Sequence, residues 1–279
     1  FAIDFNCDSA SECASLAAAS NITLMGDAEL HEGQLRLTRA GQPNLSPTTI
    51  GFENRLQPVL HGSEDATRPD TVFAHGVAVL TLPYGTHMLN LHVNFTAIVG
   101  AGPDDGGEGF AVSYGGGPLD SIGEFGGGLG LRVQFLTGGG EHEYGSRVHV
   151  YHDGDLLGSS PLPDGVGLRA ERPVNVSITA ETSGVSVRYD GHLLFDRLAW
   201  QAGGPGWAPQ PDWQLAFSAA CAARPDNHWI DNLQVETGTR VADTPVAVSV
   251  ALNGQQFVDL YESLGYAFET RPQAPPPLN

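Results

Sequence analysis

Apolar and polar residues alternate along several short stretches of this chain. In residues 88–99 (MLNLHVNFTAIV), Leu91, Val93 and Phe95 fall on one side of an extended strand, whereas Asn94 falls on the other. The same period of two runs through the segments 35–38 (LRLT), 147–153 (RVHVYHD), 175–181 (NVSITAE) and 185–191 (VSVRYDG). This alternation predicts β-strands that bury one face and expose the other.

The breaks between these stretches carry the residues that turns require. Asp190-Gly191 separates two apolar runs and predicts a tight β-hairpin. Glycine- and proline-rich segments typical of loops lie at 100–109, 137–145 and 201–212. Helical periodicity is confined to residues 9–20, where Ser9 or Ser11 would cap one or two turns. Together these elements predict an all-β sandwich or jelly roll.

Composition and charge exclude several classes of partner. The 279 residues include 41% hydrophobic ones, enough for a sizeable core, and only 16% charged ones. The formal net charge is −19, and all 13 basic residues are arginines that form no cluster. Binding to nucleic acid or to an anionic membrane surface is therefore not expected. No apolar run is long enough to span a bilayer, so we expect no membrane insertion in this segment.

Three Asn-x-Ser/Thr sequons occur in the chain, at Asn21, Asn94 and Asn175. Such sequons are acceptors for N-linked glycans in secreted proteins. Cys7 and Cys13 are close enough in sequence to close a small disulfide loop in an oxidising compartment. Cys221 would then be either a buried thiol or disulfide-bonded to another chain. These features predict a secreted or cell-surface glycoprotein.

The segment 107–135 (GEGFAVSYGGGPLDSIGEFGGGLGLRVQF) places a glycine-rich stretch between two apolar runs. A dinucleotide-binding loop needs a strand, a glycine turn and then a helix, but these glycines lead from one strand into another. A flexible linker is not favoured either, because strands flank the glycines closely. The pattern indicates a loop at the rim of a β-sheet.

Motifs in and around this segment resemble those of the L-type (legume-type) lectins. Residues 108–112 (EGFAV) resemble an acid-Gly-aromatic strand start, and residues 127–131 (GGLGL) resemble the Gly-Gly-x-Leu-Gly strand that follows a Pro- and Gly-rich loop. Further similarity to the family's early strands, its back-sheet hairpin and its ending lies at 22–38, 177–195 and 213–236. The resemblance covers about residues 1–237 and implies a concanavalin A-like jelly-roll sandwich.

The resemblance also implies a sugar site and a metal site. Glu108 takes the place of the family's usual Asp, and Gly127 or Gly128 would offer a backbone N–H to the sugar. The family's calcium ligands follow in a Glu-Phe-Asp stretch, where this chain has residues 134–136 (QFL). A leucine side chain cannot bind calcium. We therefore expect no calcium site of the family type, no other metal and no cofactor.

A glycoside hydrolase of jelly-roll architecture is a less favoured alternative. Glu141 and Glu143 are two positions apart, so on a strand both side chains would point to the same face, as the carboxylate pair of a retaining enzyme does. The pair lies in a glycine-rich loop, without a third acid. A rim of solvated charge explains the pair more simply, so we assign no catalytic residue.

Four tryptophans could form a platform for stacking sugar rings. Trp213 and Trp229 belong to alternating segments and are expected in the core. Trp207 lies among glycines and prolines, which makes it the best candidate for an exposed ring, with loop packing as the alternative.

The chain is expected to divide into three parts. These are a lectin-like β-sandwich domain at 1–240, a small β-hairpin at 241–270 and a proline-rich linker at 271–279. The hairpin faintly resembles the final strands of an immunoglobulin-like repeat, and its few residues are too small a unit to fold alone. The proline run cannot join a central strand.

These observations leave two candidate functions. The first is an extracellular structural or adhesive lectin-like module of a cell-surface or filament-forming glycoprotein, whose partners are other extracellular glycoproteins or copies of itself. The second is a calcium-independent lectin that binds glycans. The missing metal ligands, the sequons and the proline-rich end favour the first.

Overall fold

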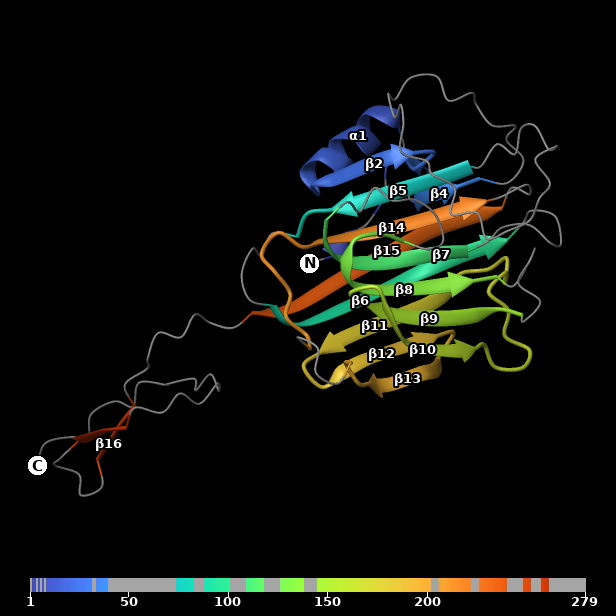
Figure 1. Ribbon diagram of the computed structural model, residues 1–279. Helices are drawn as coiled ribbons and strands as arrows, with labels where there is room; N and C mark the ends of the chain where they lie inside the picture. The colour runs from blue at the N-terminus through green and yellow to red at the C-terminus, as the bar shows by residue number, and fades with distance from the viewer. Residues whose placement is uncertain are drawn as a thin grey trace, which may run out of the picture. The chain divides into compact units, whose positions relative to one another are not determined.

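A computed structural model describes most of the chain and divides it into two compact units, Phe1–Gly238 and Thr239–Asn279. The described residues are 2–3, 5, 7, 9–31, 34–39, 74–82, 88–100, 109–117, 126–137, 145–201, 206–221, 226–239, 248–251 and 257–260. The first unit is a sandwich of two antiparallel sheets (Figure 1).

One layer is an eight-stranded sheet. Its strands lie in the order β13 (His192–Leu198), β12 (Gly184–Tyr189), β11 (Val174–Glu181), β6 (Met88–Gly100), β15 (Asn227–Thr239), β4 (Gln34–Thr38) and β3 (Glu29–His31), with β1 (Ala2–Ile3) also paired to β15. The other layer is a seven-stranded sheet. Its order is β10 (Asp155–Pro161), β9 (Arg147–His152), β8 (Leu129–Leu136), β7 (Gly109–Gly116), β14 (Gln214–Cys221), β5 (Ala74–Leu80) and β2 (Ile22–Gly26).

The strand alternation seen in the sequence is the alternation of burial in the structure. On β6, Leu91, Val93 and Phe95 are buried, whereas Asn94 is only partly buried. The predicted hairpin between β12 and β13 is also confirmed. Its two turn residues, Asp190 and Gly191, have φ values of 50° and 78°, as a type I′ turn requires at both central positions.

Aromatic rings join the two sheets across the core. Phe95 of the eight-stranded sheet meets Phe217 of the seven-stranded sheet edge to face, with ring centroids 5.2 Å apart. Next to them, Phe110 stacks on Phe135 at 4.6 Å. All four are buried. Burial of this kind supplies the main stabilisation of a sandwich, because each large side chain removes apolar surface from water.

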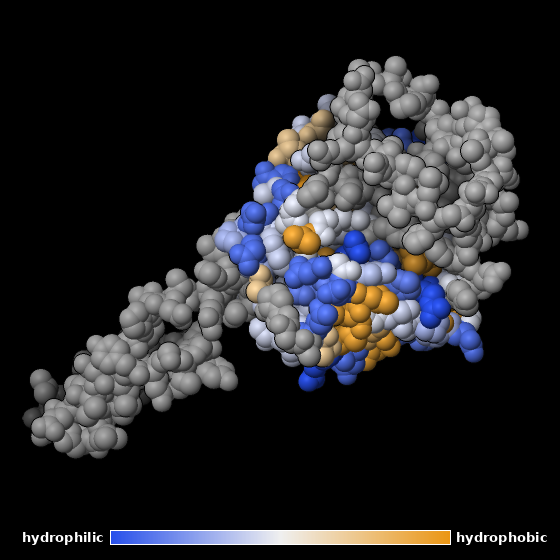
Figure 2. All heavy atoms as spheres, viewed as in Figure 1, coloured by the Kyte–Doolittle hydropathy of each residue, from blue (hydrophilic) through white to orange (hydrophobic). Residues whose placement is uncertain are grey.

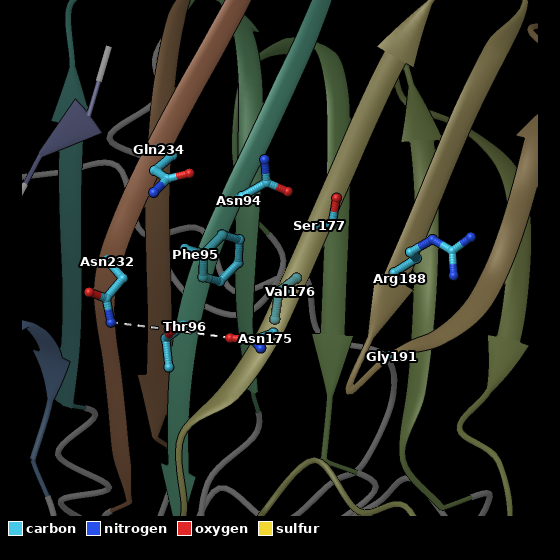
Figure 3. A pocket seen from close by; sticks show the side chains of 10 residues that line it. All are labelled: Asn94, Phe95, Thr96, Asn175, Val176, Ser177, Arg188, Gly191, Asn232 and Gln234. Atoms are coloured by element: carbon cyan, nitrogen blue, oxygen red, sulfur yellow. Dashed lines mark hydrogen bonds between the residues drawn. The ribbon is translucent and has the colours of Figure 1, made fainter.

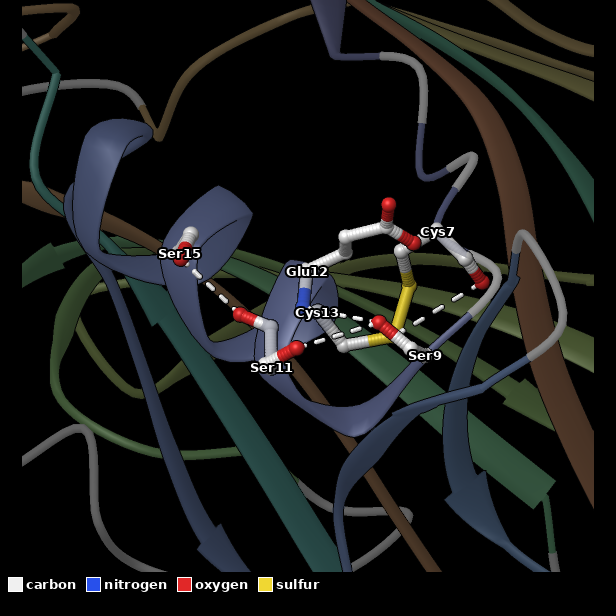
Figure 4. Close-up of a disulfide and its surroundings, with 6 residues drawn as sticks. All are labelled: Cys7, Ser9, Ser11, Glu12, Cys13 and Ser15. Carbon is white, nitrogen blue, oxygen red and sulfur yellow. Dashed lines mark hydrogen bonds between the residues drawn. A yellow bond between two sulfur atoms is a disulfide. The ribbon is translucent and has the colours of Figure 1, made fainter.

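A disulfide and a helix lie between β1 and β2 in the chain. Helix α1 (Ala10–Ala19) begins at Ser9, whose Oγ accepts a hydrogen bond from the N–H of Glu12 at 3.3 Å. Ser9 rather than Ser11 is therefore the N-cap. A disulfide joins Cys7 to Cys13 of this helix, as predicted from their spacing (Figure 4). The bond fixes the start of the helix to the segment before it.

The second unit contains one antiparallel pair, β16 (Val248–Ala251) and β17 (Phe257–Leu260). This pair falls within the hairpin expected at 241–270. Its likeness to an immunoglobulin-like repeat stays a prediction, and the linker expected at 271–279 lies outside the described residues.

Candidate functional site

The outer face of the seven-stranded sheet carries a group of polar side chains. Successive residues alternate between the core and this face, so Val112, Leu131 and Val133 point inward. The outward residues of the three central strands are Ala111 and Ser113 on β7, Arg132 and Gln134 on β8, and Arg147, His149 and Tyr151 on β9. Register pairs Ser113 with Arg132 and Arg132 with Tyr151, which makes a continuous row across three strands.

Arg132 is the centre of this row. Its guanidinium carbon lies 4.5 Å from the centroid of the Tyr151 ring, a cation–π contact. Tyr151 in turn has its hydroxyl 3.4 Å from His149 Nδ1. Within the described part of the chain, Arg132 contacts no carboxylate, and its Nε has no hydrogen-bond partner. Partial burial lowers the pKa of Arg132, and the nearby Tyr151 opposes this. A guanidinium in this position can donate hydrogen bonds to a hydroxyl-rich or anionic group.

The glycines predicted to form a rim loop lie directly over this row. An ideal Cβ added to Gly126 would be 2.6 Å from Ser113 Oγ and 3.0 Å from Arg132 Cδ, so the loop backbone touches the sheet. Gly127 is buried, and Gly128 is partly exposed with φ +80°. Close backbone approach therefore explains Gly126. Donation of the Gly127 or Gly128 N–H to a sugar stays a prediction.

We expect Gly126→Ala to destabilise the domain and lift the loop from the sheet. Gly206→Ala is the matched control, because Gly206 has nearly the same φ (+64° against +61°) but open space around its added Cβ. In both variants the free energy of unfolding should fall by about 1–2 kcal/mol, because alanine is strained in the left-handed backbone conformation. In Gly126→Ala it should fall by roughly 1–3 kcal/mol more, because the added Cβ overpacks the site. Urea unfolding midpoints measure the difference, and equal losses would show that the loop does not press on Ser113.

Calcium ligation was the second property that the lectin resemblance implied for this face. Gln134 and Leu136 stand where the family has acids, and they are 2% and 6% exposed. Calcium takes six to eight oxygen ligands, but Leu136 offers none and Gln134 offers one amide oxygen. No group of three or more His, Cys, Asp or Glu side chains able to hold a metal occurs among the described residues. The side chains on this face therefore do not fit a calcium ion.

Several acids singled out in the sequence cannot be compared with this geometry. Glu108, the expected sugar ligand, lies outside the described residues, as do Glu141 and Glu143. Their roles remain predictions.

Of the two alternatives for Trp207, an exposed stacking ring or packing within its loop region, the structure shows a packed ring. Its side chain is 8% exposed and stacks on Trp200, with ring centroids 5.3 Å apart. Tyr114 and Trp213 complete the cluster at 5.9 and 6.2 Å. Packing of the indole on these rings is favourable, because it removes a large apolar area from water. Trp213 and Trp229, expected in the core, are only partly buried.

A buried polar network, which the sequence patterns did not reveal, lies between β4, β14 and β15. Cys221, Asp226 and His228 are fully buried there, together with Thr38. Thr38 Oγ1 donates to the Asp226 carbonyl oxygen at 2.8 Å and lies 2.7 Å from His228 Nδ1. Because the one hydroxyl hydrogen goes to that carbonyl, we assign the imidazole hydrogen to Nδ1.

The network contains an ion pair between Arg169 and Asp226. Arg169 Nε donates to Asp226 Oδ2 at 2.7 Å, although the Asp226 side chain is fully buried. Cys221 Sγ is 3.8 Å from His228 Nδ1. A cysteine beside a histidine can form a nucleophilic pair, but zero exposure of both keeps any substrate away. The arrangement is structural, and Cys221 is a buried thiol as one of its two predicted alternatives had it.

Burial sets the ionisation of this network. Desolvation, and next the charge of Arg169, lower the pKa of His228 to about 3. Its Nε2 is buried without a hydrogen-bond partner, so a second proton there would have no acceptor. His228 is therefore neutral at physiological pH.

The two-sheet sandwich, with its glycine loop on the outer face of the seven-stranded sheet, is the fold of L-type lectin-like domains. The chain is similar to the metal-free carbohydrate recognition domain of Emp46p, at 15% identity over 77% of this chain and 88% of that one, with a TM-score of 0.51. It is also similar to the exoplasmic/lumenal domain of VIP36 bound to Ca²⁺ and Man3GlcNAc, at 16% identity over 81% and 89%, with a TM-score of 0.51. A legume lectin-like domain from Entamoeba histolytica matches at 9% identity over 84% and 97%, with a TM-score of 0.52.

These likenesses confirm the resemblance inferred from the sequence motifs at the level of the fold. Identities this low say nothing about the ligand, because one fold hosts many functions. No protein-family profile matches the sequence, and no curated protein sequence matches it either. In the described part of the chain, no helix is long and apolar enough to cross a membrane.

Figure 2 shows the described surface in the orientation of Figure 1, with hydrophilic residues over much of it and apolar residues gathered in its lower part. Two large apolar side chains of the seven-stranded sheet are exposed, Leu129 at 63% and Leu156 at 52%. Leu156 pairs with Tyr151, so it extends the Arg132 row to the sheet edge. A polar row that ends in an apolar residue is suited to a ligand with both kinds of surface.

Proposed function

We propose that this chain is an extracellular, non-enzymatic lectin-like module that serves structure or adhesion in a larger cell-surface or filament-forming glycoprotein. The observation that carries the proposal is the outer face of the seven-stranded sheet. This face belongs to a lectin-type sandwich and carries the glycine loop. On it, Gln134 and Leu136 replace the acids that the lectin resemblance implies. Its partners are other extracellular glycoproteins or further copies of the chain.

Three further observations support the extracellular placement. The chain has three sequons, a disulfide between Cys7 and Cys13, and the fold of domains described as exoplasmic or lumenal in VIP36. Disulfides persist in oxidising compartments. The formal net charge of −19 suits a solvated module that stays apart from anionic membranes.

A second candidate function is sugar binding without calcium, which the Arg132 row favours. A half-buried guanidinium, stacked on Tyr151 and without a carboxylate beside it among the described residues, provides hydrogen-bond donors and an aromatic edge on the same face. Such groups can hold a sugar without a metal.

A glycan array probed with and without a calcium chelator tests the proposal. We expect binding to be either absent or unaffected by chelator, because Gln134 and Leu136 stand where the lectin resemblance implies calcium-binding acids. Silence on the array together with self-association or glycoprotein binding, measured by light scattering and surface plasmon resonance, supports the structural or adhesive function. Tight binding of one sugar class that the chelator abolishes would overturn it.

The residue-level test uses Arg132→Gln, with Arg197→Gln as control. Arg197 is exposed on β13 in the other sheet, at 74% side-chain exposure. Binding of the glycan or glycoprotein partner should weaken about tenfold or more in Arg132→Gln, the loss expected for a charged hydrogen bond. Arg197→Gln should bind normally. Equal binding by both variants would exclude the outer face as the recognition surface.

A further inference from the structure

Two of the three sequons meet on the eight-stranded sheet. The antiparallel register of β6 and β11 places Asn94 opposite Ser177 and Asn175 opposite Thr96. Each pair joins the asparagine of one sequon to the hydroxyl residue of the other. The sequons Asn94-Phe-Thr96 and Asn175-Val-Ser177, far apart in the sequence, thus form one reciprocal patch.

Both asparagines face away from the core. Their strand neighbours Phe95 and Val176 are buried at 3% and 2%, whereas Asn175 is exposed and Asn94 is partly exposed. Thr96 Oγ1 donates to Asn175 Oδ1 at 3.4 Å, and Asn232 Nδ2 donates to Thr96 Oγ1 at 3.5 Å (Figure 3). These bonds use the oxygen of Asn175 and leave its Nδ2 unengaged within the described part of the chain. Nδ2 is the atom to which an N-linked sugar is attached.

A shallow groove surrounds the patch. It has a volume of about 340 Å³, at the lower end of the range of roughly 300–1,000 Å³ for small-molecule sites. Besides the two sequons, polar side chains from β12 and β15 line it, namely Arg188, Asn232 and Gln234. Amides and a guanidinium can bond to the hydroxyl and acetamido groups of a sugar. The groove can therefore hold the sugars nearest the protein.

We propose that Asn94 and Asn175 form a paired glycosylation site whose first sugars lie side by side in this groove. The proposal rests on the extracellular placement in the proposed function. The glycans then cover the outer face of the eight-stranded sheet and leave the outer face of the seven-stranded sheet for recognition. Asn21, exposed beyond helix α1, is an unpaired third sequon.

The attachment uses a lipid pyrophosphate-linked oligosaccharide as the sugar donor. The asparagine Nδ2 attacks C1 of the first sugar, forms the C–N bond and loses one proton. The C1–O bond breaks, and the lipid pyrophosphate leaves with the bonding electron pair. Both asparagines belong to central strands of a finished sheet, so transfer must precede pairing of β6 with β11.

The test is glycopeptide mass spectrometry of the full chain secreted from a host with N-linked glycosylation, followed by timed glycan release from the folded protein by a peptide amidase. We expect all three sequons to be occupied, and release at Asn94 and Asn175 to be about tenfold slower than at Asn21, as one or two hydrogen bonds to the groove would give. Asn94→Gln should speed release at Asn175, and Asn175→Gln should speed it at Asn94, because each opens the groove. Asn21→Gln should change neither rate.

The outcomes separate the two proposals. Occupied Asn21 with an empty Asn94 or Asn175 overturns the paired site and leaves the extracellular placement intact. Full occupancy with equal release rates at all three sites overturns the seating of the sugars in the groove. No glycan at any sequon overturns both the paired site and the glycoprotein part of the proposed function.

Discussion

Replacing Arg169 with alanine is expected to lower the free energy of unfolding by about 3–5 kcal/mol, the cost of removing one member of a buried ion pair. Arg169 lies in the loop between β10 and β11, and its Nε is 2.7 Å from the fully buried Asp226 carboxylate. Without the guanidinium, the buried carboxylate loses this charged hydrogen bond and keeps the one that the Asn227 N–H donates to its Oδ1 at 3.0 Å. Urea unfolding of the variant, followed by tryptophan fluorescence, measures the loss.

Arg172→Ala is the matched control for this experiment. Arg172 lies in the same loop and pairs with Asp190 at 2.5 Å, but its side chain is 55% exposed. A hydrogen bond from the Arg172 guanidinium lowers the pKa of the Asp190 carboxyl, but the pair lies at the surface in contact with water. Exposed pairs contribute little to stability, so Arg172→Ala should unfold close to the wild type. Equal losses in the two variants would show that burial of Asp226 is not what makes Arg169 important.

Stability is expected to fall in acid because of His228. Its pKa is about 3 in the folded chain and close to 6.5 in the unfolded chain, so only the unfolded chain binds this proton between those values. The contribution of His228 is therefore complete above pH 6.5 and is lost as the pH falls towards 3. One proton of difference corresponds to about 1.4 kcal/mol for each pH unit. Unfolding free energies measured from pH 7 to pH 4 test this dependence.

His228→Asn isolates that proton from the aspartates and glutamates that also titrate in acid. An asparagine amide can occupy the place of Nδ1 and donate to Thr38 Oγ1, but it does not titrate. The variant should be less stable than the wild type at pH 7, and the difference between the two should shrink by about 1.4 kcal/mol per unit below pH 6.5. A constant difference at all pH values would mean that His228 does not control acid stability.

Much of the sandwich could be predicted from local patterns. The alternation in 88–99 predicted β6 and its buried face, and Asp190-Gly191 predicted the β12–β13 hairpin, because each depends on residues adjacent in the chain. The disulfide between Cys7 and Cys13 followed from a short spacing in the same way. The order of the lectin-like motifs extended these local predictions to the whole fold.

The candidate site was predicted only in part. The glycine loop was expected at a sheet rim, and Gly126 lies on the row of Ser113 and Arg132. No pattern singled out Arg132, because an arginine on an outward strand position resembles any solvated residue. Its place in the site depends on Tyr151 beside it, which the register of β8 with β9 decides.

By itself, the sequence determined the strands, their buried faces, the tight turn at Asp190-Gly191 and the small disulfide, because backbone conformation and side-chain alternation act over a few residues. Only the tertiary structure decided which distant segments meet. It buried Trp207 against Trp200, joined His228 to Cys221 and Thr38, and brought the sequons of Asn94 and Asn175 to one patch. Strand order and register bring these residues together, and both are set by packing of the whole core rather than by any one segment.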